Sequence, residues 1–536
     1  MKRMTKNLKA ECLRRAAASF KNFLCENRRA LTAAFCFTLV CYGFMLTHYT
    51  LTIDEETWIC NTDPALIQKI WMLQGRFGLY LFDAVFTPLG RYVPFLWDFL
   101  GIVFWFAGGV VFCFCLTRYV SAVSRLSVGV FAAMFTTVPL AVGELLSYSM
   151  FSLQQGLAML LVSASAALTF FWFRTRRGMA AAGAALLLFA GVSFYQAFAT
   201  VYITAMAAYV CLSLIYGSGG RIWRSLVGSV GIFAAGVGAY FLINAYITRV
   251  LYPGADAYLE NNFIGWDGGN PLVPLLPAVK NTARVLLGRE VYGGKALLLL
   301  TVLTALAFCI RLVLLIRERN GRAAAGLIVG FAALLLAPFS MLLGFAQPTL
   351  IGRTLLALPL SMSVQAVLVV DTARLLPKPS ASRWIAGGLL LCVLLINAAY
   401  MNNLFYNSYR VYTEDQAKAA QIMSRIAGEG MDASEKPVVF IGMLPQNAYL
   451  SADCSAGGSF FAWDNGNIAR MRDFLNAEGY TILPADADQI QRGALLAEEM
   501  PCWPAEGCAA DAGDFILIKF SDPAYPWGIV NGAAVS

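Results

Sequence analysis

Three adjacent carboxylates, Asp54, Glu55 and Glu56, stand in the segment LTIDEETWICN, directly after about twenty mostly apolar residues. A carboxylate that is partly desolvated at the end of an apolar segment can orient a hydroxyl group and accept its proton. The same residue types also suit the first turn of a helix, where Asp54 could cap the helix and the other two would meet the positive end of its dipole. The segment therefore has two interpretations, a general base and a helix start.

Glu144, in the segment AVGELLSYS, is a further acidic residue with apolar neighbours. Burying an unpaired charge at membrane depth costs several kcal/mol, so an acid in such a place needs a partner or a function. Glu144 is therefore a candidate second carboxylate of a catalytic site. The alternative is a solvated helix end.

Two arginines have surroundings that suit phosphate binding, because a guanidinium matches phosphate oxygens with a fixed fork of donors. Arg353 in QPTLIGRTLL follows a proline and a glycine that could break a helix and expose backbone donors. Arg76 in GRFG belongs to the aromatic, mildly amphipathic stretch WMLQGRFGLYLFDAVF, which suits a helix on the membrane surface. The alternatives are an ordinary interface arginine at 353 and a side chain that reaches lipid headgroups at 76.

The predicted loops supply less specific candidates. Further cations stand in AVKNTARVLLGREVYGGK, namely Lys280, Arg284, Arg289 and Lys295. Residues that could stack on a sugar or hydrogen-bond its hydroxyl groups are Trp71, Tyr195, Gln196, Trp266, Asp267, Trp463 and Asp464. Loop polarity alone also predicts residues of these types.

The elements that must position these side chains follow from composition. Hydrophobic residues make up 59% of the chain and charged residues 13%, which excludes an ordinary soluble globular protein. Apolar runs of roughly twenty residues alternate with clusters of Arg and Lys, as in polytopic α-helical membrane proteins. We predict about eleven spans, at residues 31–52, 93–117, 126–142, 152–173, 179–196, 198–216, 225–251, 296–316, 323–343, 355–373 and 384–402.

The basic clusters set the orientation, since cytoplasmic loops carry the excess of Lys and Arg. They fall on one side of the predicted membrane, at residues 118–125, 174–177, 221–224, 317–322 and 374–383. The N-terminus, residues 1–30, is also basic and amphipathic and is predicted to stay cytoplasmic. The outer face then receives the 53–92 loop, the 143–150 turn, the 252–295 loop and everything after about residue 403.

The last part of the chain, residues 403–536, differs from the rest because helix-like and strand-like segments alternate in it. This pattern indicates a small α/β domain outside the membrane. The predicted organisation is a cytoplasmic N-terminus at 1–30, a transmembrane domain at 31–402 and an extracytoplasmic α/β domain at 403–536.

The chain offers few ligands for a transition metal. It has no C-x-x-C pair, and its single histidine, His48, falls inside the first predicted span, so we expect no His or Cys zinc site. Cys502 and Cys508 in CWPAEGC are close enough in sequence to pair, and both redox states stay open. Clustered carboxylates suit a hard divalent cation, but consecutive residues seldom converge on one ion. We therefore expect no cofactor and no metal requirement.

Several short motifs together resemble the type II O-antigen glucosyltransferase family. They are the acidic first outer loop, Trp71, GRFG at 75–78, FYQAF at 194–198, IGRTLLALP at 351–359, and YTEDQAKAAQIMSRI followed by VVFIG. The resemblance extends from about residue 31 to about residue 520. Members of this family are multispanning enzymes of the C-type glycosyltransferase class, GT-C.

The resemblance implies transfer of glucose from undecaprenyl phosphate glucose to a lipid-linked surface polysaccharide such as O-antigen, outside a bacterial inner membrane. It places the catalytic carboxylate at Asp54 or Glu55, with Glu56 in the helix turn and Glu144 as a second acid. Arg76 then sits at the donor or positions the loop. Attack by the acceptor hydroxyl opposite the leaving lipid phosphate would invert the anomeric carbon.

Other function classes remain open at the level of sequence. A transporter or flippase of lipid-linked sugars would also have many spans, although we see no inverted repeat with matched Gly or Pro breaks. A polysaccharide polymerase or ligase, or an assembly subunit without chemistry, would also fit a polytopic chain with an outer domain. The sugar, the acceptor and the oligomeric state do not follow from the residues.

Overall fold

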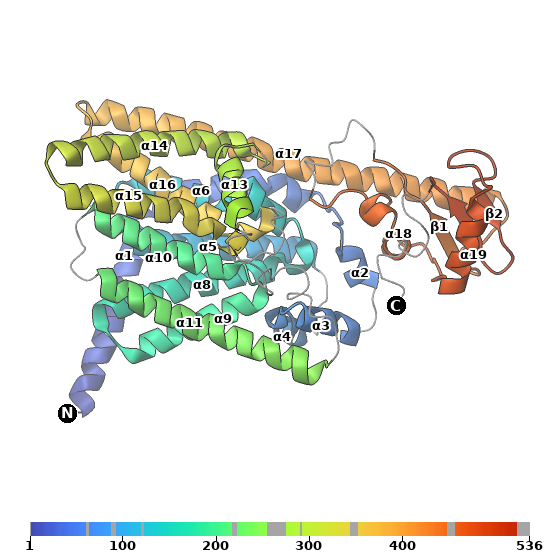
Figure 1. Cartoon of the computed structure of the whole chain (residues 1–536), viewed down its shortest axis with the longest axis horizontal. Helices are drawn as coiled ribbons and strands as arrows, with labels where there is room; N and C mark the ends of the chain where they lie inside the picture. The colour runs from blue at the N-terminus through green and yellow to red at the C-terminus, as the bar shows by residue number, and fades with distance from the viewer. Residues whose placement is uncertain are drawn as a thin grey trace. The chain divides into compact units, whose positions relative to one another are not determined.

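The computed structural model describes residues 2–60, 64–86, 93–118, 120, 123–216, 222–253, 275–289, 292–343, 352–446 and 456–522. This part of the chain is mostly helical (Figure 1) and divides into two compact units. Unit 1 comprises Met1–Gly43 and Gln68–Asn402, and unit 2 comprises Phe44–Ile67 and Asn403–Ser536. The segment Phe44–Ile67, which sequence grouped with the transmembrane domain, thus belongs with the C-terminal part of the chain.

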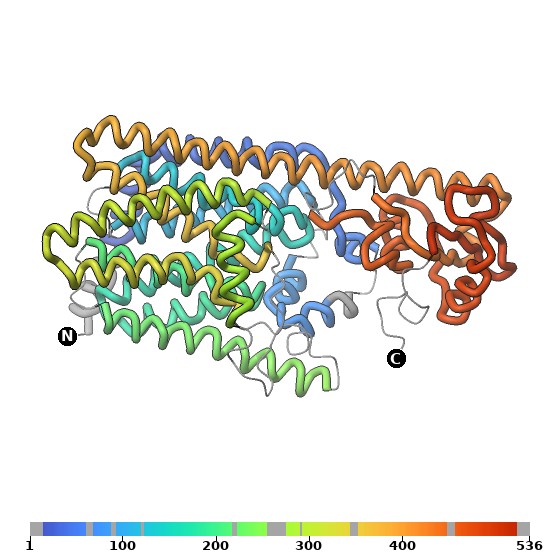
Figure 2. The backbone as a smooth tube through the Cα atoms, turned by 45° about the horizontal axis from the view of Figure 1, so that its top comes forward, coloured from blue at the N-terminus to red at the C-terminus, as the bar shows by residue number. Residues whose placement is uncertain are grey.

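Unit 1 is built from long helices that run alongside one another (Figures 1 and 2). The helices that lie in it or begin in it are α1 (Lys2–Thr47), α4 (Phe77–Phe86), α5 (Pro94–Thr117), α6 (Arg125–Thr136), α7 (Glu144–Leu146), α8 (Ser149–Thr175), α9 (Gly178–Phe194), α10 (Phe198–Ile215), α11 (Ile222–Tyr246), α13 (Leu275–Leu286), α14 (Gly294–Arg317), α15 (Gly321–Leu336), α16 (Leu358–Thr372) and α17 (Pro379–Gly428). A short helix, α3 (Pro64–Leu73), precedes α4.

Among the described residues, nine helices are long and apolar enough to cross a membrane, and a bent pair, Arg125–Thr136 with Pro139–Leu146, makes up to ten. Every predicted span falls on one of these helices or on α9. The difference from the predicted eleven lies in α9, which has 17 residues and is shorter than the others. Long helices are expected here, since each satisfies its own backbone hydrogen bonds in lipid.

The closest helix packing in unit 1 joins α5 to α8 at two glycines. A Cβ atom on Gly156 would lie 2.3 Å from the Gly101 carbonyl oxygen, and one on Gly101 would lie 2.5 Å from the Ser152 carbonyl oxygen. Small residues allow such close backbone approach between apolar helices. This crossing fixes the N-terminal end of α8, which carries part of the candidate site.

Unit 2 contains a three-stranded sheet in the order β1-β3-β2, with β1 at Val438–Ile441, β2 at Ala509–Asp511 and β3 at Ile516–Lys519. β1 pairs with β3 in parallel, with Val438 opposite Ile516, and β2 pairs with β3 antiparallel. The helices α18 (Ile468–Ala477) and α19 (Ala487–Ala497) pack on this sheet. β1 and β3 are buried throughout, whereas β2 is only partly buried.

The helix α17 continues for 50 residues, through the end of unit 1 and into unit 2. The sequence pattern predicts a span that ends at 402, followed by a separate helix-like segment. No proline or glycine stands between Gly388 and Gly428, so nothing in the sequence ends the helix at 402.

Candidate functional site

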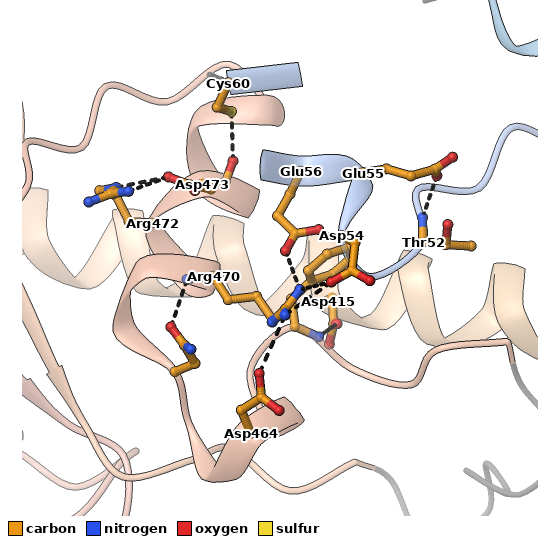
Figure 3. Close-up of polar contacts among 12 residues, drawn as sticks. Thr52, Asp54, Glu55, Glu56, Cys60, Asp415, Asp464, Arg470, Arg472 and Asp473 are labelled. Carbon is orange, nitrogen blue, oxygen red and sulfur yellow. Dashed lines mark hydrogen bonds and ion pairs between the residues drawn. The ribbon is translucent and has the colours of Figure 1, made fainter. Parts of the chain in front are cut away.

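The described part of the acidic segment, residues 51–60, lies in unit 2 and packs against the C-terminal part of the chain (Figure 3). Leu51 and Ile53 are buried in the apolar core of the unit. At Asp54 the backbone turns with φ of 83°, a left-handed conformation that aspartate tolerates better than most residues. The turn leads into the short helix α2 (Glu55–Cys60), which packs on α18.

Glu55 is buried, and its carboxylate closes the turn at the start of α2. The backbone N–H of Thr52 donates to Glu55 Oε2 over 2.8 Å, and the Glu55 N–H donates to the Thr52 carbonyl over 3.1 Å. The Glu55 side chain points toward Thr52 and away from Arg470 (Figure 3). This is the geometry of a helix start, in which an acidic side chain reaches back to a free backbone N–H.

Glu56 is also buried, and it forms an ion pair with Arg470 of α18. Burial raises the pKa of Glu56 to about 7, and the positive charge of Arg470 partly opposes that rise. The guanidinium in turn has its pKa raised by the surrounding carboxylates, in spite of its own burial. Glu56 is therefore a buried partner of Arg470, and it shares the first turn of α2 with Glu55.

Asp54 is the exposed member of the acidic segment, with 55% of its side chain accessible. Arg470 Nη1 and Nη2 both donate to Asp54 Oδ1 over 3.2 Å. Arg470 Nη2 also contacts Asp464 Oδ2 over 3.3 Å (Figure 3). Of the three adjacent carboxylates, Asp54 is thus the one that a substrate can reach from solvent.

In unit 1, Glu144 and Arg353 lie together at two irregular turns. Glu144 begins α7 directly after the π-helical turn η2 (Pro139–Gly143), and Arg353 lies in the 3₁₀ turn η5 (Gly352–Thr354). The backbone N–H of Arg353 donates to the Glu144 carboxylate, and its guanidinium interacts electrostatically with the same group. A Cβ atom on Gly352 would lie 2.4 Å from Glu144 Oε2, so this packing requires glycine at 352.

Arg353 also contacts Tyr148, at the N-terminal end of α8. Its Nη1 donates to the tyrosine hydroxyl over 2.8 Å, and the guanidinium carbon lies 5.4 Å from the ring centre. The same end of α8 is held by Asp98 of α5, whose carboxylate accepts hydrogen bonds from Ser149 over 2.8 Å and Ser152 over 2.7 Å. Asp98 is buried and therefore fixes the helix that presents Tyr148.

A row of aromatic rings connects Tyr148 to Arg76. Tyr148 stacks on Phe151, and Phe151 meets Trp71 edge to face. The Arg76 guanidinium lies 5.9 Å from the Trp71 ring centre and 5.1 Å from that of Tyr195. Cation–π contacts orient an arginine without using all of its donors. Arg76, Trp71 and Tyr195, which sequence analysis singled out separately, therefore form one group with Arg353 at its other end.

The GRFG turn that carries Arg76 is fixed by polar contacts around Gly75. Gln196 Nε2 donates to the Gln74 carbonyl over 2.8 Å, and Tyr240 Oη donates to the Gly75 carbonyl over 3.0 Å. Gly75 has a φ of 68°, and a Cβ atom there would lie 2.4 Å from the Tyr240 hydroxyl. The Gln196 amide thus positions the turn in the structure, while a contact to sugar stays a prediction for this residue.

The remaining candidates are more scattered. Arg289 and Lys295 are exposed, at the end of the segment after α13 and in the first turn of α14. Trp463 and Asp464 are exposed in the 3₁₀ turn η8 (Trp463–Asn465) of unit 2. Trp266 and Asp267 lie outside the described residues. Cys502 and Cys508 are free thiols in the structure.

No group of three or more His, Cys, Asp or Glu side chains that could hold a metal ion occurs among the described residues. Asp54, Glu56 and Asp464 do gather, but they surround the guanidinium of Arg470, which already neutralises part of their charge. The expectation of a metal-independent protein stays a prediction.

Arg470, Tyr148 and Asp98 were not among the residues predicted from the sequence. Asp98 stands alone near the start of an apolar span, so the reasoning applied to Glu144 would have found it. Tyr148 is four residues after Glu144 and gives no signal of its own. Arg470 lies in NIARMRDF, an ordinary amphipathic helix pattern, and only the folded chain shows its partners.

A family model described as Glucosyl transferase GtrII matches residues 43–370, more than half of the chain. The matched range contains Asp54, Arg76, Glu144 and Arg353, and it ends before Arg470. No curated protein and no solved structure matches the chain.

Proposed function

The chain belongs to the GtrII glucosyltransferase family, and on that premise we propose that it transfers glucose, or a related hexose, from a polyprenyl phosphate sugar to a lipid-linked surface polysaccharide such as O-antigen. The family match carries the assignment of a glucosyltransferase. The nine or ten long apolar helices among the residues that the structure describes support a membrane location for it. We place it in a bacterial inner membrane, with the N-terminus cytoplasmic and residues 403–536 outside the cytoplasm.

The donor phosphate is assigned to Arg353. As the bond to the sugar breaks, its electron pair passes to a phosphate oxygen, which needs positive charge rather than a strong acid. Arg353 is suited to this because its guanidinium is permanently charged and is oriented by Tyr148. Glu144 accepts the Arg353 backbone N–H, so it fixes the turn that carries the cation. We therefore assign Glu144 to holding this turn, and to proton transfer only if Asp54 proves dispensable.

Arg76 is assigned as a second cation in the same unit. It lies against Trp71 and Tyr195 on a turn that two polar side chains, Gln196 and Tyr240, restrain. A partly exposed guanidinium in a fixed place can contact a phosphate or sugar oxygen without a large loss of side-chain entropy. Lys295 and Arg289 are exposed cations and are assigned no specific contact.

We assign deprotonation of the acceptor hydroxyl to Asp54. The hydroxyl oxygen attacks the anomeric carbon while the carbon–oxygen bond to the lipid phosphate breaks, and the hydroxyl proton passes to the Asp54 carboxylate. Attack from the side opposite the phosphate inverts the anomeric centre. Asp54 suits this role because it is the exposed carboxylate of the segment, whereas Glu55 and Glu56 are buried in backbone and ion-pair contacts.

The test is sugar transfer by the purified full chain in nanodiscs, from radiolabelled polyprenyl phosphate glucose to a lipid-linked glycan. Asp54→Asn is expected to lower kcat by about 10² to 10⁴, the usual contribution of a general base. Glu55→Gln is expected to retain activity if the protein folds. Transfer from UDP-glucose with no transfer from the lipid donor would overturn the donor assignment. Full activity of Asp54→Asn would move the base to Glu144, with Glu144→Gln as the next variant.

A further inference from the structure

We propose that Arg470 is a positioning residue, whose guanidinium holds the carboxylate of Asp54 in the orientation that accepts a proton. The inference rests on the proposed role of Asp54 as the base. Arg470 itself touches neither sugar in this scheme. It acts through Asp54, and it is contributed by a part of the chain that the family match does not reach.

The contacts between the two side chains are directional. Nη1 and Nη2 of Arg470 both donate to Oδ1 of Asp54 over 3.2 Å. Two donors on one oxygen restrain the rotation of the carboxylate more than a single contact does. Oδ2 is then the oxygen that meets the acceptor hydroxyl, in a side chain that is 55% exposed.

The backbone of Asp54 is fixed independently of Arg470. Leu51, Thr52, Ile53, Glu55 and Glu56 are all buried, so the residues on both sides of Asp54 are anchored. A Cβ atom on Gly457 would lie 3.3 Å from the backbone nitrogen of Ile53, which shows how closely this segment packs. With the backbone held, the side-chain torsions of Asp54 remain to be restrained, and Arg470 restrains them.

The guanidinium is itself held from three sides (Figure 3). Besides Asp54 it contacts Glu56, which is fully buried, and Asp464, over 3.3 Å. The backbone N–H of Arg470 donates to the side chain of Asn467, the residue that caps α18. Only 15% of the Arg470 side chain is exposed, so it has little freedom to leave Asp54.

The place of Arg470 in α18 supports a role other than helix stability. It lies in the first turn, where the helix dipole disfavours a positive charge. Arg472, two residues later, pairs with its neighbour Asp473, and its side chain points away from Asp54 (Figure 3). The two arginines of this helix therefore provide a matched pair for experiment.

The first measurement is kcat and KM for both substrates, in the full chain, for Arg470→Gln, Arg470→Lys, Arg472→Gln and Asp54→Asn. Arg470→Gln is expected to lower kcat by about 10-fold to 100-fold with KM changed by less than about 3-fold, since a misplaced base slows chemistry more than binding. Arg470→Lys should recover only part of the loss, because lysine keeps the positive charge but its single ammonium cannot replace the two donors of the guanidinium. Arg472→Gln is expected to match wild type.

A double variant tests whether the two residues act as one. Arg470→Gln combined with Asp54→Asn should be no slower than Asp54→Asn alone, since a positioning residue has nothing left to position. Losses that multiply would overturn the inference. If Arg470→Gln is fully active while Asp54→Asn is inactive, the inference fails and the proposed function stands. If Asp54→Asn is fully active, the assignment of the base fails instead.

Arg470→Gln leaves Glu56 buried without its partner, so the effect of this variant on folding must be separated from its effect on Asp54. Arg470→Gln with Glu56→Gln removes both charges, and Glu56→Gln alone is its control. The orientation of Asp54 can also be tested without measuring activity, by carbodiimide labelling of carboxyl groups followed by mass spectrometry. Labelling of Asp54 is expected to rise several-fold in the variants that lack Arg470 and to stay at the wild-type level in Arg472→Gln. Equal labelling in all of them would show that Arg470 does not restrain Asp54.

Discussion

Arg353 donates a hydrogen bond to the Tyr148 hydroxyl over 2.8 Å while its guanidinium lies over the ring of the same residue. One aromatic side chain thus restrains the arginine in two ways, by a polar contact at its edge and by its π face. The two restraints can be separated, because phenylalanine keeps the ring and removes the hydroxyl.

Tyr148→Phe is therefore expected to raise KM for the lipid donor by about 10-fold, the value of a hydrogen bond to a charged group, with a smaller effect on kcat. Steady-state kinetics with varied donor measures this. Tyr406→Phe is the matched control, since Tyr406 accepts a hydrogen bond from Arg410 in a similar pair in unit 2. An unchanged donor KM in Tyr148→Phe would remove Arg353 and Tyr148 from the donor site.

Asp98→Ala is expected to lower the stability of unit 1 by about 2–3 kcal/mol, since two buried serine hydroxyls lose their shared acceptor inside the packed α5–α8 pair. Asp98→Asn keeps one acceptor oxygen and should lose less. Thermal unfolding in detergent compares the variants. Equal melting temperatures for wild type and Asp98→Ala would contradict the anchoring role.

Gly78→Ala should disturb the turn that carries Arg76. A Cβ atom at this position would lie 2.8 Å from the carbonyl carbon of Ser193, so α4 must move away from the end of α9. We expect lower thermal stability together with reduced sugar transfer. Gly238→Ala is the control, because a Cβ atom there meets nothing within 4 Å. The same loss in both variants would show a general effect of glycine replacement.

The stability of unit 2 should fall as the pH rises from about 4.5 to about 7. Burial raises the pKa of Glu56 in the folded chain to about 7, above its ordinary 4.5. As the pH rises, Glu56 therefore ionises in the unfolded chain before it does in the folded chain, and this ionisation stabilises the unfolded state. At about 1.4 kcal/mol per pH unit, the loss amounts to at most about 3 kcal/mol and is complete above pH 7.

Hydrogen exchange of the α18 amides in the full chain, corrected for the intrinsic pH dependence of exchange, measures this trend. Glu56→Gln is expected to remove it, and Glu429→Gln, which alters an exposed ion pair with Arg425, should leave it intact. A trend that persists in Glu56→Gln would assign the pH dependence to another group.

Transfer activity should survive extensive treatment with a chelator. The developing negative charge is assigned to arginine side chains, and Asp54, Glu56 and Asp464 already share the guanidinium of Arg470. Radiolabelled transfer before and after EDTA treatment measures this directly. Activity that is lost and then restored by magnesium or manganese would overturn the expectation.

The helical part of the fold was accessible from sequence because apolar runs and basic clusters are local signals. All predicted spans fall on helices, and the family resemblance was confirmed. The separation of Asp54 from Glu55 and Glu56 was not accessible, since three adjacent acids look alike until burial distinguishes them. The pair of Asp54 and Arg470 is separated by 416 residues, and no periodicity connects such positions.

The grouping of Leu51–Cys60 with the last part of the chain has a consequence for biosynthesis. At about 5–20 residues per second, the ribosome needs roughly 20–80 s to reach Arg470 after it has made Asp54. During that interval Leu51 and Ile53 have no apolar core to enter, and Glu56 has no cation beside it. The acidic segment therefore completes its contacts late in the synthesis of the chain, and a nascent chain that stalls before residue 470 carries the proposed base without the arginine that orients it.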